Sequence, residues 1–145
     1  MKKLVVISVL SLIAIGCFYF VFCWYNDINH VAVVWDFVSG DLHLDENHSF
    51  GFNWRPWVLV ARIDTRPVRV CITSSSRAFN CKLVQFEPKE WREFVRIEGF
   101  RYYWFANRIS FNWGHEETYR GMRDILRGYA FSAQKYPFIK VLRDY

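Results

Sequence analysis

Charged side chains are absent from the N-terminal part of this 145-residue chain after Lys2 and Lys3. From Leu4 to Tyr25, twenty-two consecutive residues include no Asp, Glu, Lys or Arg. At a rise of about 1.5 Å per residue, a helix of this length crosses the roughly 30 Å hydrocarbon core of a bilayer. The run predicts a transmembrane anchor that starts at Leu4, with Trp24 and Tyr25 as an interfacial aromatic belt at its far end.

A small-x-small cleavage site is also missing after Tyr25, and the apolar run is longer than the h-region of about 7 to 15 residues in a signal peptide. An uncleaved anchor is therefore favoured over a cleaved signal. Lipidation is a second alternative, because Ala14-Ile15-Gly16-Cys17 loosely resembles a lipoprotein cleavage box. The residues after Cys17 stay apolar, where a lipoprotein normally becomes polar. Otherwise Cys17 and Cys23 are small hydrophobic residues within the run.

Lys and Arg are absent between Lys3 and Arg55, whereas Asp27 follows the apolar run closely. Positive charge is usually retained on the cytoplasmic side of a span. We therefore predict a single-pass membrane protein with a cytoplasmic N-terminus, and with residues 26–145 as one domain outside the cytoplasm. The lipid bilayer is the first partner this implies.

The sequence also lacks the patterns that carry catalysis. No glycine-rich phosphate loop, nucleophile elbow or metal-ligand spacing of Cys and His occurs. The run from His115 to Tyr119 begins like a zinc-protease motif, but Tyr119 stands where the second histidine is needed. We expect His30, His43 and His48 to be solvated or packed. The prediction is a protein that is not an enzyme and holds no metal or cofactor.

A dense basic cluster is missing as well. The formal net charge is +5, and subtracting Lys2 and Lys3 leaves +3 for residues 26–145. This mild balance disfavours nucleic acid as a partner. Arg120, Arg123 and Arg127 recur at helical spacing, and we expect mainly a solvated face there. Contact with an anionic partner or with membrane phosphates is the functional alternative.

Aromatic residues, in contrast, make up 20% of the chain. Buried rings each remove on the order of 150 to 250 Å² from water, so a small domain built from them can be stable. We expect most members of one aromatic set to lie in the core, and an interfacial or protein-binding patch is the alternative. The set comprises Trp54, Trp57, Tyr102, Tyr103 and Trp104.

Apolar and β-branched runs predict a meander of antiparallel strands packed on one side. The expected strands cover residues 30–35, 42–44, 50–57, 58–63, 68–72 and 79–86. If the last two pair about Ser76, Cys71 falls opposite Cys81, and the two could form a disulfide in an oxidising compartment. Two buried free thiols are the alternative.

Helical periodicity appears in the second half. Pro88 suits a first helical position, and the spacing of apolar residues predicts a helix over residues 89–97 that ends near Gly99. Glu116 and Glu117 are expected to begin a second helix. Residues 100–105 and 109–113 leave helix and strand open, and a short apolar piece follows at residues 138–142. The fold class is therefore α+β: a small antiparallel-sheet domain packed with two to three helices, behind an N-terminal transmembrane helix.

Three motifs carry a resemblance to a known family. They are His30-Val31-Ala32-Val33-Val34-Trp35-Asp36-Phe37-Val38-Ser39-Gly40, then Gly51-Phe52-Asn53-Trp54-Arg55-Pro56-Trp57, then Ile63-Asp64-Thr65-Arg66-Pro67. Behind a membrane anchor, this arrangement resembles the stomatin, prohibitin and flotillin superfamily, whose shared module is the SPFH or band-seven domain. The run from Cys81 to Pro88 likewise resembles the family's strand that leads into its first helix.

The resemblance implies a membrane-associated scaffold, or a modulator of another membrane protein or of itself in an oligomer. Residues 45–49 depart from the family because they lack its Pro-Gly. The sequence also ends at Tyr145, where family members continue into a long heptad-patterned helix that drives ring assembly. A lipid-anchored or secreted binding module that uses its aromatic surface is the alternative, and a membrane-bound enzyme is the least favoured one.

The anchor can be tested by extracting native membranes with alkaline carbonate. Because an apolar span stays in the hydrocarbon core, we expect the full chain to remain in the pellet. A soluble polypeptide that begins after Tyr25 would contradict the anchor.

Overall fold

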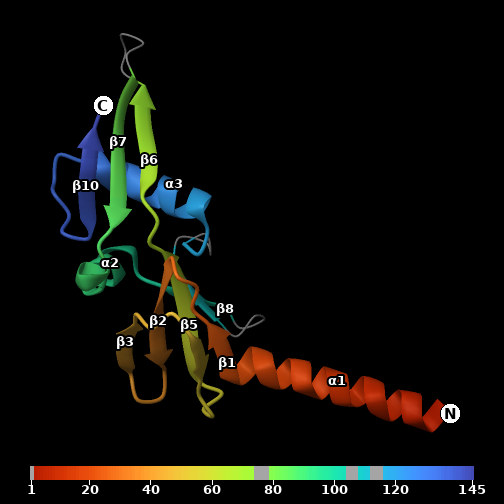
Figure 1. The fold of residues 1–145 in the computed structure, drawn as a ribbon. Helices are drawn as coiled ribbons and strands as arrows, with labels where there is room; N and C mark the ends of the chain where they lie inside the picture. Colours follow the sequence, from red (N-terminus) through yellow and green to blue (C-terminus); the bar gives the residue numbers. More distant parts are fainter. Residues whose placement is uncertain (1, 74–78, 104–107, 112–115) are drawn as a thin grey trace.

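The computed structural model of this chain describes residues 2–73, 79–103, 108–111 and 116–145. Its fold is α+β, with an N-terminal apolar helix and a domain of small antiparallel sheets and helices. Helix α1 (Lys2–Phe22) has no buried residue and projects away from the domain (Figure 1). Within the described residues it is the one helix long and apolar enough to cross a membrane, a criterion that a signal sequence at this position also meets.

The helix ends three residues before the predicted end of the span. Cys23–Tyr25 form strand β1, which pairs antiparallel with β4 (Phe50–Phe52). Trp24 lies opposite Gly51 in this ribbon and packs against the small buried cluster of Ala32, Val34 and Val58. Burial of the indole stabilises an extended backbone at residues whose composition alone is compatible with helix.

Three further strands form an antiparallel sheet in the order β3-β2-β5. Its members are β2 (His30–Asp36), β3 (Asp41–Asp45) and β5 (Val58–Asp64). The β2–β3 turn closes at Gly40, whose φ of +74° favours glycine. These three strands match the predicted positions within one or two residues.

A second sheet has the order β10-β7-β6 and contains β6 (Val68–Thr73), β7 (Phe79–Phe86) and β10 (Ile139–Asp144). The predicted single meander is therefore wrong, because β5 and β6 lie in different sheets (Figure 1). Pro67 lacks a backbone N–H and stands in the connection between them, where a continued ladder would need one. Cys71 pairs with Cys81 across β6 and β7, and a disulfide of 2.06 Å joins their sulfurs.

The helices lie close to their predicted positions. A 3₁₀ turn, η1 (Pro88–Glu90), leads into α2 (Trp91–Glu98), and Gly99 ends this helix at a φ of +63°. Helix α3 (Tyr119–Ala130) begins later than expected, because the Thr118 hydroxyl caps it by accepting from the Gly121 N–H at 3.1 Å. Glu116 is buried before the helix rather than exposed in its first turn. The sequence does not separate helix from strand at residues 100–105 and 109–113. The structure has two paired antiparallel strands in this region, β8 (Arg101–Tyr103) and β9 (Arg108–Ser110).

One core spans both sheets, and Phe94 of α2 stands at its centre. The ring centroid of Phe94 lies 5.1 Å from that of Phe86 and 5.3 Å from those of Phe111 and Phe138. All four side chains are fully buried. Helix α3 contributes Met122, Ile125 and Leu126 to the same core and packs mainly on β6. The helices are therefore held by apolar contacts across both sheets.

The aromatic set departs from its expected burial. Trp54 is 66% exposed and Tyr102 is 50% exposed, whereas Trp57 and Tyr103 are half-buried. Trp104 lies outside the described residues. Trp54 stands in the connection between β4 and β5.

The close contact between Trp24 and Gly51 predicts that a methyl group added at position 51 lowers the stability of the fold. A Cβ at position 51 would lie 2.1 Å from the Trp24 indole, so Gly51→Ala displaces the ring from its cluster. We expect a loss of about 1 to 3 kcal/mol in the free energy of unfolding, measured by denaturant titration in detergent. In Gly128→Ala on α3 no atom crowds the added Cβ, and this control should be neutral or up to about 1 kcal/mol more stable. Equal stability of the two variants would contradict the packing role of Gly51.

Candidate functional site

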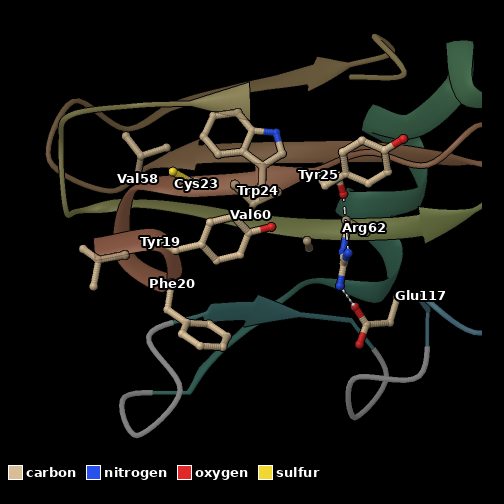
Figure 2. Close-up of a pocket in the computed structure, with 11 residues that line it drawn as sticks. Tyr19, Phe20, Cys23, Trp24, Tyr25, Val58, Val60, Arg62 and Glu117 are labelled. Carbon is tan, nitrogen blue, oxygen red and sulfur yellow. Dashed lines mark hydrogen bonds and ion pairs between the residues drawn. The ribbon is translucent and has the colours of Figure 1, made fainter. Parts of the chain in front are cut away.

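A hollow lies where α1 meets the domain, and it is here called the junction pocket. Its volume is about 280 Å³, and Figure 2 shows it between the last turn of α1, strand β1 and strand β5. The residues that line it are Tyr19, Phe20, Val21, Cys23, Trp24, Tyr25, Val58, Val60, Ala61, Arg62 and Glu117. The pocket thus combines three segments that are far apart in the sequence.

Aromatic contacts fix the helix end that forms one wall. The rings of Phe18 and Phe52 are 6.1 Å apart, and those of Tyr19 and Phe50 are 6.2 Å apart. In addition, the Asn53 N–H donates to the carbonyl of Phe22, the last residue of α1, at 2.9 Å. The helix therefore leaves the domain in a defined direction, and the wall does not depend on side chains of α1 alone.

A single guanidinium closes the opposite end. Arg62 donates through Nη2 to Glu117 Oε2 at 2.8 Å and through Nη1 to the Tyr25 carbonyl at 3.4 Å (Figure 2). The Arg62 side chain is 45% exposed and that of Glu117 is 27% exposed. In water, a pair this exposed contributes about 0.2 to 1 kcal/mol. Its main consequence is that a positive and a negative group stand together at the rim of an aromatic pocket.

Packed polar groups hold Glu117 in place. The Glu117 carbonyl lies 3.1 Å from His30 Nε2, which therefore donates, because a carbonyl oxygen can only accept. His30 Nδ1 is buried without a hydrogen-bond partner in the described part of the chain. Next to Glu117, buried Glu116 accepts from the Ser110 hydroxyl at 3.2 Å. These contacts bind the segment before α3 to β2 and β9.

The charged side chains of the pocket are Arg62 and Glu117, which pair with each other. Its other lining residues are aromatic or aliphatic, apart from Cys23. Among the residues that the structure describes, no group of three or more His, Cys, Asp or Glu could hold a metal ion. His115, from the zinc-protease-like run, lies outside the described residues.

The resemblance motifs contribute structural ion pairs. Asp36 from the first motif accepts from Arg55 of the second at 3.0 Å, which joins the β2–β3 turn to the loop before β5. Asp64 and Arg66 of the third motif form a bidentate pair, and the Asp64 side chain is completely buried. The hydrogen bond with Asp64 raises the pKa of the Arg66 guanidinium above its ordinary value. The motifs thus meet at the connections of the fold rather than in the junction pocket.

On α3, Arg120 and Arg127 are exposed and Arg123 is half-buried. Arg123 is paired with Asp124 at 3.2 Å, and Arg120 and Arg127 face solvent without an ion pair in the described part of the chain. Contact of these three residues with an anionic partner stays a prediction. Free Cys23 lines the junction pocket, and free Cys17 is exposed on α1.

The sequence assigns neither Arg62 nor Glu117 a binding role, although Glu117 belongs to the zinc-protease-like run and to the expected start of a helix. Arg62 is the charged residue in the otherwise apolar run from Val58 to Ile63. A charged side chain in such a run indicates that this face of the strand contacts a polar group. No protein-family model matches the chain, and no curated protein matches it. The SPFH resemblance therefore rests on the motif residues.

The Asp36–Arg55 contact predicts a pH dependence of stability. Asp36 accepts from the N–H groups of Ser39 and Val38 and from Arg55, which lowers its pKa below the ordinary value of 3.8. Because the folded-state pKa is lower than the unfolded one, the stabilisation is complete above about pH 5, where both states are ionised, and disappears as the pH falls through the folded-state pKa.

We therefore expect the difference in Tm between the wild type and Asp36→Asn to be largest near neutral pH and to shrink in acid. Asp124→Asn is the matched control, since Asp124 is a mostly exposed carboxylate. A Tm difference for Asp36→Asn that stays constant between pH 7 and about pH 2 would contradict the role of the charge.

Proposed function

We propose that this chain is a single-pass membrane protein whose domain lies outside the cytoplasm and acts, without catalysis, as an SPFH-like scaffold or modulator of a membrane protein complex. The observation that carries the proposal is the direct passage from α1 into the domain. The helix ends at Phe22 and β1 begins at Cys23, so no linker separates the apolar helix from folded structure. A domain attached in this way is held at the membrane surface.

Two features support the orientation. Lys2 and Lys3 stand before the helix, whereas Asp27 is the first charge after it. The domain also contains the Cys71–Cys81 disulfide, and disulfides persist in oxidising compartments outside the cytoplasm.

Exposed aromatic side chains support a role in binding other proteins. Trp54 and Tyr102 are at least half exposed, and Phe37 is 47% exposed. Phe37 and Tyr102 also line an apolar hollow of about 250 Å³ together with Trp35 and Leu59. Aromatic residues are enriched at protein interfaces because they bury much area at little cost in conformational entropy.

The same hollow favours a second candidate function, a binding module that recognises a partner through its aromatic surface. This module would need no span, so it also fits a lipid-anchored or secreted form. The two candidates differ in the membrane attachment of the mature chain.

Site-specific photo-cross-linking in native membranes tests the scaffold. A photoreactive residue in place of Trp54 should yield adducts larger than the monomer, since this side chain protrudes from the domain. The control position is Lys89 on the 3₁₀ turn, which is exposed and far in the sequence from the aromatic residues. Monomer alone at position 54, in membranes that retain the chain, would contradict a scaffold that contacts its partner through this exposed aromatic side chain.

A further inference from the structure

We propose that the junction pocket binds the headgroup of a zwitterionic phospholipid, with the phosphate at Arg62 and the ammonium at Glu117. This inference rests on the proposed membrane attachment, because it requires α1 to lie in the bilayer. The lipid's acyl chains would then run beside the helix.

The position of the pocket along the helix fits a headgroup. Tyr19 and Phe20 stand within the last turn of α1, so at about 1.5 Å per residue they lie within about 5 Å of its end. The helix is about 30 Å long, which equals the hydrocarbon thickness. With α1 across the membrane, the pocket opens where hydrocarbon gives way to headgroups, and the Arg62–Glu117 pair lies on its polar side.

The charges at the rim complement a phosphate and an ammonium group. A guanidinium carries five N–H donors, of which the described structure uses one for Glu117 and one for the Tyr25 carbonyl. Donors remain for phosphate oxygens, and Arg suits these through its planar fork. An ionised carboxylate accepts several hydrogen bonds, so Glu117 can accept from an ammonium while it keeps Arg62. The paired charges thus match a ligand that is itself a pair of charges.

The size and lining of the pocket set the part of the lipid that enters. A volume of about 280 Å³ is at the low end for small-molecule sites. It holds a headgroup and the start of the glycerol, but not two acyl chains. Tyr19, Phe20 and Val60 supply the apolar side next to α1. An anionic lipid without an ammonium would leave Glu117 facing a second negative charge, so phosphatidylethanolamine should bind better than phosphatidylglycerol.

Lipid retention by the full chain tests this site. The protein, purified in mild detergent, is equilibrated with equal amounts of phosphatidylethanolamine and phosphatidylglycerol and then washed, and the retained lipids are quantified by mass spectrometry. We expect the wild type to keep about one phosphatidylethanolamine per chain. Arg62→Gln should lower this by about tenfold, the effect of losing one charge-assisted contact. Arg96→Gln, which breaks the exposed Arg96–Glu93 pair on α2, is the matched control and should retain lipid like the wild type.

Two further variants separate the parts of the pocket. Glu117→Gln should leave total lipid retention similar but remove the preference for phosphatidylethanolamine. Val60→Phe, which leaves both charges in place, should exclude the headgroup by filling the pocket. Photoactivatable phosphatidylethanolamine should in addition label the wild type within residues 19–25 or 58–62, a result that depends on no variant.

Equal retention by the wild type and a folded Arg62→Gln would overturn the proposal, as would labelling of the wild type confined to α1 before Tyr19. Either result in a chain that resists alkaline extraction leaves the membrane anchor intact and removes the lipid site alone. Release of the chain by alkali would instead remove the proposed function, so the two failures are distinguishable.

Discussion

Strand β1 (Cys23–Tyr25) begins directly after α1 and pairs with β4 (Phe50–Phe52). The position of the domain relative to α1 depends on this pairing. The Phe22 carbonyl accepts from Asn53, and Trp24 packs over Gly51 into the cluster of Ala32, Val34 and Val58. Fixing several backbone residues costs about 1 to 2 kcal/mol each, so burial of the indole is needed to offset the ordering of so short a ribbon. With the helix end held in this way, the domain cannot swing freely relative to α1.

A second constraint joins the two sheets. The chain passes from β5 to β6 through residues 64–67, and the completely buried Asp64 carboxylate pairs there with Arg66. The Asp64 N–H also donates to the Glu116 carbonyl at 2.8 Å, which ties the same connection to the segment before α3. A buried carboxylate that lost its cation would retain a large desolvation cost. This motif therefore stabilises the connection and gives no evidence for a reactive site.

Local patterns predicted much of the fold. Apolar and β-branched runs located β2, β5, β6 and β7, and Gly99 correctly marked the end of α2. The errors came from contacts that a local pattern does not contain: Cys23–Tyr25 extends an apolar run but is held by β4, and Glu116 is buried beside Ser110 instead of starting a helix. The junction pocket could not be predicted for the same reason, since residues near 20, 60 and 117 meet in it only in the folded chain.

The energetics of the Arg62–Glu117 pair depend on where the domain sits. In bulk water its partial exposure limits it to about 1 kcal/mol or less. In the proposed placement, one side of the pair faces the bilayer boundary, where the effective dielectric constant is lower and each charge is attracted more strongly to its partner. Desolvation of the two charges increases in the same place, so the protein pair alone gains little net stability. A phosphate and an ammonium would restore the lost solvation of both groups at once, and a pair with little effect on folding would then decide which lipid occupies the end of α1.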